Sequence, residues 1–317
     1  MSNVARVTRV SVVVPARNSA ATLPRTLEAL RRQELAGDHE VIVVDDGSTD
    51  DTAAIAERAG VSVLHQRHEG PARARDRGVS AAAGKAIAFT DADCFPQPGW
   101  LARGLAALAS ADLVQGAVHP DPSEPMGPFD RSIWAVEENG LYETANLFVT
   151  RELFDRVGGF GEWVEPERGK ILGEDILFGW KARRLGARTA FCPEALVHHA
   201  VFPRRLRDHV LERRRLVHFP ELARRVPELR RHLFFARWFL SRRTAAFDAA
   251  LPAAALALAR RSPLPLAAAL PYAVIALHEA RYWRRRAPAA LAGNVLADAV
   301  GLASLLEGSA RRRSLVL

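Results

Sequence analysis

Short runs of β-branched and aliphatic residues recur through the first two thirds of the chain, and each is followed by a polar turn. The first run is stopped by Pro15, and two later runs end in Asp45 and Asp91. Continuous apolar runs of about four to eight residues are typical of strands that are buried on both faces. The predicted strands are residues 10–14, 40–45, 61–64, 86–89, 112–118, 145–150 and 188–191.

Helical periodicity fills the intervals between several of these strands. Leu23, Leu27 and Leu30, for example, share one face of a helix that Asn18 or Ser19 can cap. Further helices are predicted near residues 52–59, 71–83, 98–109 and 176–185. Strands alternating with helices predict an α/β fold with a doubly wound, mostly parallel sheet flanked by helices. Such folds bind ligands at the carboxyl ends of their strands, where residues 15–18, 45–46 and 91–93 fall.

The composition changes beyond Pro203, and we place a boundary there, giving regions 1–203 and 204–317. The second region alternates arginine clusters and aromatic residues with stretches rich in alanine and leucine, and is predicted to be α-helical. A spanning helix needs about 20 apolar residues. Residues 263–277 fall short of that length, and Asn294 and Asp298 interrupt the longer stretch 287–306. This region is either a soluble helical appendage or a set of helices in the membrane interface, and the interleaved arginine and aromatic residues favour membrane association.

The charge balance indicates an anionic partner. The 317-residue chain has a formal net charge of +8 and a pI near 10.4, which suits nucleic acid, a phosphate-bearing substrate or an anionic membrane surface. Cys94 and Cys192 form no disulfide or metal-binding pattern. No apolar signal segment precedes the first predicted strand, so we expect the catalytic part at the cytoplasmic face of the membrane.

Two carboxylates follow the strand that is predicted at residues 86–89. Because strand side chains alternate between faces, Asp91 and Asp93 are expected to point the same way where the strand ends. Hard oxygen ligands at this edge of an α/β sheet suit a divalent cation that carries phosphate oxygens.

Six motifs, in order, resemble those of family 2 glycosyltransferases with the GT-A fold. They are Val12-Val-Val-Pro-Ala-Arg-Asn18, Val43-Val-Asp-Asp-Gly-Ser-Thr-Asp50, Gly70-Pro-Ala-Arg-Ala-Arg75, Thr90-Asp-Ala-Asp93, Val157-Gly-Gly-Phe160 and Gly173-Glu-Asp175. The resemblance covers about residues 8–200. It departs at Asp76, where the family usually has Asn, and at Gly161-Glu162, where Asp-Glu is usual. The arginine–tryptophan motif of processive synthases is missing, which indicates transfer of one or a few sugars.

The resemblance implies a role for each motif. Pro15, Arg17 and Asn18 would line the nucleotide pocket, and Asp45 or Asp46 would hydrogen-bond the uracil or ribose. Arg75 would reach the base or the diphosphate. Asp91 and Asp93 would hold Mn²⁺ or Mg²⁺ with the donor diphosphate, Asp93 as the more direct ligand, and the His198-His199 pair lies where some relatives place a further metal or diphosphate contact.

Asp175 is the catalytic base that the resemblance implies. In the inverting mechanism, a carboxylate removes the acceptor hydroxyl proton while that oxygen attacks the anomeric carbon. A helix N-terminus stabilises a carboxylate and weakens it as a base, whereas burial and the neighbouring Glu174 oppose this effect. We also expect segment 163–172 to become ordered when the donor binds, with Glu162 or Trp163 touching the acceptor.

The sequence therefore predicts a metal-dependent inverting glycosyltransferase. The resemblance implies that its donor is a nucleotide-diphosphate sugar of the UDP type and that its acceptor is a hydroxyl of an envelope glycan or lipid-linked glycan. No nucleic acid partner is expected. A nucleotidyltransferase would share the metal carboxylates without needing Asp175, and an inert GT-A module could act as a membrane-bound binding protein. A Rossmann dehydrogenase is disfavoured, because no Gly-X-Gly-X-X-Gly turn follows Val14.

Overall fold

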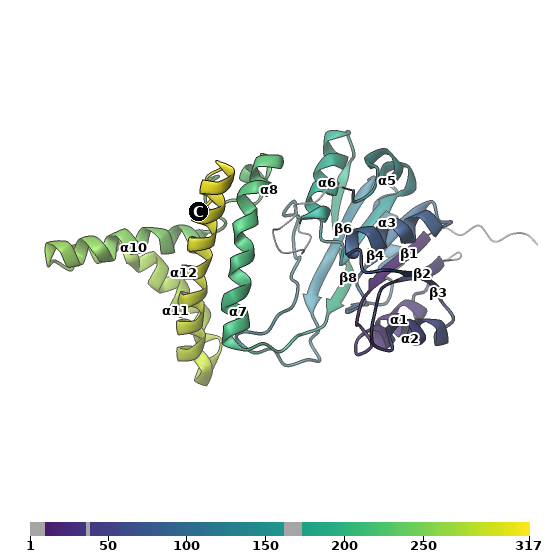
Figure 1. Cartoon of the computed structure of the whole chain (residues 1–317), viewed down its shortest axis with the longest axis horizontal. Coiled ribbons are helices and arrows are strands. Elements are labelled where there is room, and N and C mark those ends of the chain that lie inside the picture. Colours follow the sequence, from purple (N-terminus) through teal and green to yellow (C-terminus); the bar gives the residue numbers. More distant parts are fainter. Residues whose placement is uncertain (1–9, 36–38, 162–172) are drawn as a thin grey trace, which may run out of the picture. The chain divides into compact units, whose positions relative to one another are not determined.

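The computed structural model describes residues 10–35, 39–161 and 173–317, which form two units (Figure 1). The sheet unit comprises the described residues up to Glu124 together with Ser132–Val201. The helical unit comprises Pro125–Arg131 and Phe202–Leu317. The segment Pro125–Arg131, which the sequence analysis left in the first region, thus belongs with the helical unit.

The sheet unit is built on an eight-stranded sheet with the order β3-β2-β1-β4-β7-β6-β8-β5. Its strands are β1 (Val10–Ala16), β2 (His39–Asp46), β3 (Ser62–Gln66), β4 (Ala86–Thr90), β5 (Cys94–Pro96), β6 (Leu113–Pro120), β7 (Asn146–Thr150) and β8 (Thr189–His199). Strands β1 to β4 are parallel, and β6 and β8 are parallel. Strand β7 is antiparallel to β4 and β6, and β5 is antiparallel to β8. The sheet is therefore mixed, with its parallel half at the amino-terminal end of the chain.

The last strand differs from the sequence prediction. Residues 188–191 were expected to form it, whereas β8 continues to His199 and carries the histidine pair inside the strand. The extension has a partner that the local pattern did not reveal, because the three-residue strand β5 pairs with it and places Cys94 opposite His199.

Helices cover both faces of the sheet. They are α1 (Leu23–Arg31), α2 (Thr52–Arg58), α3 (Pro71–Ala81), α4 (Trp100–Leu108), α5 (Arg151–Val157) and α6 (Glu174–Arg184). Alternate residues of β1 separate the layers: Val12 joins the core with α1, α2 and α4, while Val13 contacts Gly78 of α3 on the other face. Beside α3, the ring of Phe89 packs against Phe154 and Phe160.

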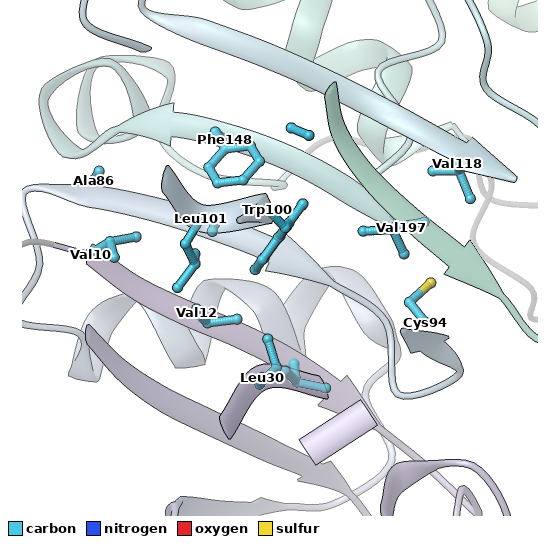
Figure 2. Close-up of a cluster of buried hydrophobic side chains, with 14 of the residues drawn as sticks. Val10, Val12, Leu30, Ala86, Cys94, Trp100, Leu101, Val118, Phe148 and Val197 are labelled. Carbon is cyan, nitrogen blue, oxygen red and sulfur yellow. The ribbon is translucent and has the colours of Figure 1, made fainter. Parts of the chain in front are cut away.

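The larger core lies between the sheet and α1, α2 and α4 (Figure 2). The ring of Phe148 of β7 packs at a tilt of 49° against Trp100 of α4, with the ring centroids 4.9 Å apart, and both side chains are fully buried. The indole of Trp100 donates to Asn146 Oδ1 at 2.8 Å, so its polar atom is satisfied inside the core. This packing fixes the strands whose ends carry the predicted site.

The helical unit consists of short helices around one long helix. Its elements are α7 (Leu206–Glu212), η1 (Arg213–His218), α8 (Phe219–Arg225), α9 (Leu229–His232), α10 (Arg242–Arg260), η2 (Leu264–Ala269), α11 (Leu270–Arg281), η3 (Arg284–Arg286) and α12 (Ala287–Arg312). Small residues of α12 permit close approach: a Cβ on Gly293 would lie 2.5 Å from the Phe129 ring, and one on Gly308 would lie 2.2 Å from the carbonyl oxygen of Val217. Arg284–Arg312 is the one helical stretch of the described residues long and apolar enough to cross a membrane, and 33% of its most apolar window is buried within the protein.

Candidate active site

Three parallel strands deliver the predicted site residues to one edge of the sheet. In the register of β1 and β2, Ala16 lies beside Asp45, and Val13 of β1 lies beside Phe89 of β4. Pro15 lies within β1, and the residues that follow these strand ends therefore meet at the same edge.

Hydrogen bonds join the turn after β1 to the turn after β2. Asn18 adopts a left-handed conformation (φ 50°), and its Oδ1 accepts from the Thr49 amide at 2.8 Å. Its own amide donates to Ser48 Oγ at 3.0 Å. The exposed Arg17 reaches across the same edge, with Nη1 3.0 Å from His68 Nε2. Asn18 is thus held by contacts between the two turns, and Arg17 contacts the loop that follows β3.

The two aspartates that end β2 differ in their hydrogen bonding. Asp45 Oδ1 accepts from the Ser48 amide at 3.1 Å. Asp46 is 3% exposed and accepts four bonds, from Gln66 Nε2, His68 Nδ1 and the amides of Glu69 and Gly70. Burial alone would raise the pKa of Asp46, but these donors together hold it below its usual value. Asp46 therefore fixes the loop before α3 as a carboxylate.

Arg75 connects helix α3 to two acidic groups. It is 4% exposed, and its Nη2 donates to Asp91 Oδ1 at 2.8 Å. Its Nη1 lies 3.4 Å from Glu174 Oε1 at the start of α6. The Nε atom is buried, and no described residue accepts from it. A buried N–H without an acceptor costs free energy, so Arg75 is suited to an anionic ligand.

The departure at Asp76 has a local explanation. Asp76 Oδ1 accepts from the Phe160 amide at 2.8 Å, where Gly159 adopts φ 74°. A Cβ on Gly159 would lie 2.5 Å from this oxygen, so the turn requires glycine. An asparagine oxygen could accept the same hydrogen bond. Asp76 is partly buried, and desolvation raises its pKa. Asp76 therefore fixes the turn that precedes Phe160.

Asp93 faces a histidine. The Nε2 atom of His199 lies 3.7 Å from Asp93 Oδ2, and His199 is 3% exposed. Its Nδ1 lies 2.6 Å from the Ala200 carbonyl oxygen, so Nδ1 carries a proton and donates there. Ligand atoms of Asp93, Cys94 and His199 all lie within 4.8 Å of one another. Carboxylate oxygen and imidazole nitrogen are a donor set that fits Mn²⁺, whereas burial raises the pKa of the Cys94 thiol well above its usual value and disfavours thiolate.

The two carboxylates of the Asp-Ala-Asp motif therefore have different neighbours. Both were predicted to hold the cation, and this stays a prediction. Asp91 Oδ1 accepts from Arg75, and the grouped donor atoms come from Asp93, Cys94 and His199.

Asp175 lies in the first turn of α6, surrounded by other acidic groups. Its Oδ1 accepts from the Ile176 amide at 2.8 Å. Desolvation raises the pKa of Asp175 well above its usual value, and the charges of Glu174 and Glu143 raise it further. These effects outweigh the Ile176 amide and Arg75, which lower the pKa. The helix N-terminus alone would lower the pKa of Asp175 and weaken it as a base. Burial and the acidic neighbours outweigh that effect and favour its protonated form.

Sequence reasoning missed Glu143. Desolvation raises the pKa of this carboxyl group, and its Oε2 accepts from Gln115 Nε2 at 2.8 Å. It lies in a stretch without hydrophobic periodicity, and a single glutamate there gave no signal. The expected contacts of Glu162 and Trp163 lie outside the described residues.

Part of the chain is similar to a known protein family. The family model described as glycosyl transferase family 2 matches residues 11–161, which include the motif strands β1, β2 and β4. Residues 11–161, a little under half of the chain, thus resemble glycosyltransferase family 2.

Two relatives show how far the likeness of this glycosyltransferase extends. Glycosyltransferase AglE of Haloferax volcanii is 28% identical over 211 residues, which cover 61% of this chain and 67% of AglE. The pre-mycofactocin glycosyltransferase of Mycobacterium tuberculosis is 31% identical over 212 residues, which cover 60% of this chain but 42% of that protein. The matched part is thus less than half of the second relative.

Two solved structures share the GT-A fold of this glycosyltransferase. Mannosyltransferase PcManGT from Pyrobaculum calidifontis, in complex with GDP-Man and Mn²⁺, superposes with a TM-score of 0.58 at 21% identity, covering 95% of this chain and 86% of that one. S. aureus TarS 1–349 gives a TM-score of 0.52 at 20% identity, with 97% and 92% covered. The predicted fold class and enzyme class are confirmed.

Proposed function

We propose that this glycosyltransferase transfers a sugar, with inversion at the anomeric carbon, from a UDP-sugar to an acceptor hydroxyl. The observation that carries the proposal is the arrangement around Arg75. This buried guanidinium contacts Asp91 of the Asp-Ala-Asp motif and Glu174. Glu174 is followed by Asp175, the carboxyl group whose pKa is raised.

The donor diphosphate is proposed to bind beside Arg75. Its phosphoryl oxygens are acceptors of the kind that the buried Nε–H lacks among the described residues. Pro15 of β1 and Asp45 of β2, with Arg17 and Asn18 in the turn after β1, form the nucleotide side of the proposed site. Asp46 contributes by holding the loop before α3, since its oxygens already accept four bonds.

Asp93 and His199 are proposed to hold a divalent cation, Mn²⁺ or Mg²⁺. When bound, such a cation neutralises negative charge on the diphosphate leaving group. Asp91 then serves the same site indirectly, because its bond to Arg75 fixes the guanidinium.

Asp175 is proposed to be the general base. Its Oδ2 accepts the acceptor hydroxyl proton, because Oδ1 already accepts from the Ile176 amide. The hydroxyl oxygen forms the new bond to the anomeric carbon on the face opposite the diphosphate. The bond from that carbon to the diphosphate oxygen breaks with its electron pair, and nucleoside diphosphate is released. A pKa raised toward the working pH suits this proton transfer.

The acceptor is proposed to be an envelope or lipid-linked glycan, met at the cytoplasmic face of the membrane. The basic and apolar helical unit supports membrane association, because arginine clusters interleaved with aromatic residues favour an anionic lipid surface.

A nucleotide-sugar panel tests this proposal. Release of nucleoside diphosphate is measured for UDP-, GDP- and other nucleotide sugars, with Mn²⁺, Mg²⁺ or a chelator. We expect turnover with a UDP-sugar that chelation abolishes, and Asp175→Asn is expected to lower the rate by about 10²–10⁴-fold while nucleotide affinity is kept. A fully active D175N variant would exclude Asp175 as the base. A preference for GDP-sugars would overturn the UDP assignment, and full activity in chelator would overturn the metal.

A further inference from the structure

Helix α11 has its small residues inside and its large apolar residues outside. Ala276 and Ala280 are its buried positions. Leu270, Val274 and Leu277, spaced four and three residues apart, are 61%, 65% and 57% exposed. This spacing places them on one face of the helix. The exposed face of α11 is therefore more apolar than its buried face.

Helix α10 repeats the arrangement over its second half. Ala253 and Ala257 are buried, whereas Leu251, Leu256 and Leu258 are 47%, 41% and 82% exposed. In the connecting segment η2, Leu264 is 82% and Leu266 is 43% exposed. We call residues 242–281, which contain α10, η2 and α11, the arm. In Figure 1, α10 extends away from α12 within the helical unit.

Such an arm is costly in water. Burying a leucine side chain is worth about 1.5–3 kcal/mol, and clustered exposed leucines usually mark a surface that is covered by a partner. Single exposed apolar residues are normal, but here they recur along three consecutive elements.

Arginines interrupt the apolar surface at the turn between α10 and η2 and border it after α11. Arg260 and Arg261 are exposed at the turn that ends α10. Exposed Arg281 continues the α11 stripe, four residues after Leu277, and Arg284–Arg286 follow with exposed Tyr282 between them. Guanidinium groups beside leucines, with an aromatic residue at the border, are the pattern of a helix that lies in the headgroup region of an anionic bilayer.

We propose that the arm is the element that contacts the membrane, with its exposed leucines among the acyl chains and its arginines on anionic headgroups. The inference rests on the membrane association in the proposed function, and it names the element responsible. A second copy of the chain is a poorer occupant, because a self-complementary interface would bring these arginine clusters together.

The long helix α12 is not this element, although its length alone would allow it to span. Its Asp298 accepts from Arg243 of α10 at 2.7 Å and from Tyr272 of α11 at 2.7 Å. Its Asn294 Oδ1 lies 3.2 Å from His209 Nε2 of α7. A helix with a paired carboxylate and a buried glycine face is the core of its unit, and it anchors the base of the arm.

Site-specific labelling tests the proposal on the full chain. Cys94 and Cys192 are 0% and 9% exposed, so an introduced surface cysteine is the preferred target of an environment-sensitive fluorophore. Val274→Cys reports on the arm, and Leu306→Cys, at a position 47% exposed on α12, is the matched control. With phosphatidylglycerol vesicles we expect a blue shift at position 274 and none at 306, and a weaker response with phosphatidylcholine alone.

Flotation with the same vesicles measures the contributions of the apolar residues and of the arginines to vesicle binding separately. The L270Q/V274Q/L277Q variant should bind roughly tenfold more weakly or worse, and R284Q/R285Q/R286Q should lose the preference for anionic lipid. L296Q/L306Q on α12 is the control and should bind as the original chain does. Circular dichroism and sugar-nucleotide turnover establish that each variant is folded.

The outcomes separate the arm from the broader proposal. If the original chain binds vesicles and L270Q/V274Q/L277Q binds them equally well, the arm assignment alone is overturned. The same holds if L296Q/L306Q loses the binding. Absence of binding to any vesicle overturns membrane association as well, and turnover then still tests the transferase. A lipid-independent dimer that L270Q/V274Q/L277Q dissolves would identify a second copy as the occupant and overturn the proposal.

Discussion

The sheet unit and the arm of the helical unit distribute their apolar residues in opposite ways. In the sheet unit, Trp100, Phe89 and Phe148 are fully buried, and its exposed large apolar residues are few among those described: Trp134, Val136 and Leu185. In the arm, the buried positions are Phe247 and four alanines, while the leucines are exposed. Composition alone therefore does not determine the role of an apolar residue. Leucine side chains stabilise the fold when they are buried in the sheet unit, and they are available to a partner when they are exposed in the arm.

The largest expected effect contrasts one apolar side chain from each unit. Phe148→Ala should lower the free energy of unfolding of the sheet unit by about 3–5 kcal/mol, because it leaves a cavity beside Trp100. Leu258→Gln in the arm should change stability by less than about 0.5 kcal/mol in the absence of lipid. Urea unfolding and hydrogen exchange measure both. A large loss in L258Q would mean that the arm is packed in solution, and the contrast between the units would fail.

Arg75→Met tests whether buried charge holds the sheet unit together at its site. The substitution leaves Asp91 and Glu174 without their guanidinium, and we expect a loss of about 3 kcal/mol in unfolding free energy together with weakened nucleotide binding. Arg77→Met, at an exposed position of the same helix, is the control and should be nearly neutral. Equal stability of the two variants would show that the Arg75 network is dispensable. The measurements are urea unfolding and nucleotide titration.

Asp248→Asn tests the helical unit, where a carboxyl oxygen is buried and no described residue donates a hydrogen bond to it. Burial and the charge of Asp298 raise the pKa of Asp248 to about 6. Because the protonated form is favoured in the folded state, stability falls as pH rises from the ordinary value of 3.8 through about 6, and the full penalty is present at pH 8.

The D248N variant lacks this titration, so it should be more stable than the original chain by about 1 kcal/mol at pH 8, allowing for the partial exposure of Asp248. The difference should vanish near pH 3.5. Hydrogen exchange in α10 and α12 is the measurement, and an unchanged pH dependence would contradict the assignment.

The smallest effect concerns Glu143. Glu143→Gln removes a negative charge that raises the pKa of Asp175, so the acid limb of the kcat/KM profile should move to lower pH by roughly one unit or less. Glu152→Gln, at an exposed position of α5, is the matched control and should leave the profile in place. A profile that does not move with E143Q would mean that Glu143 is only a structural partner of Gln115.

Much of the sheet unit could be predicted from the sequence, because its signals are local. The β-branched runs gave β1, β2, β4 and the parallel half of the sheet, and turn residues marked where those strands end. The position of β5 and the full length of β8 depend on each other, since a three-residue strand forms only when its partner is present. Periodicity within one segment carries no information of that kind.

The sequence by itself determined the resemblance to family 2 glycosyltransferases, the strand ends and the set of acidic residues available to the site, because motifs and hydrophobic runs lie along the chain. Only the tertiary structure decided that Asp91 meets Arg75 while Asp93 meets His199, and that Glu143 lies near enough to raise the pKa of Asp175. It also decided that the glycine face of α12 is buried while the leucines of the arm are exposed. Contacts between distant segments set charge, burial and desolvation, and these quantities do not exist until the chain is folded.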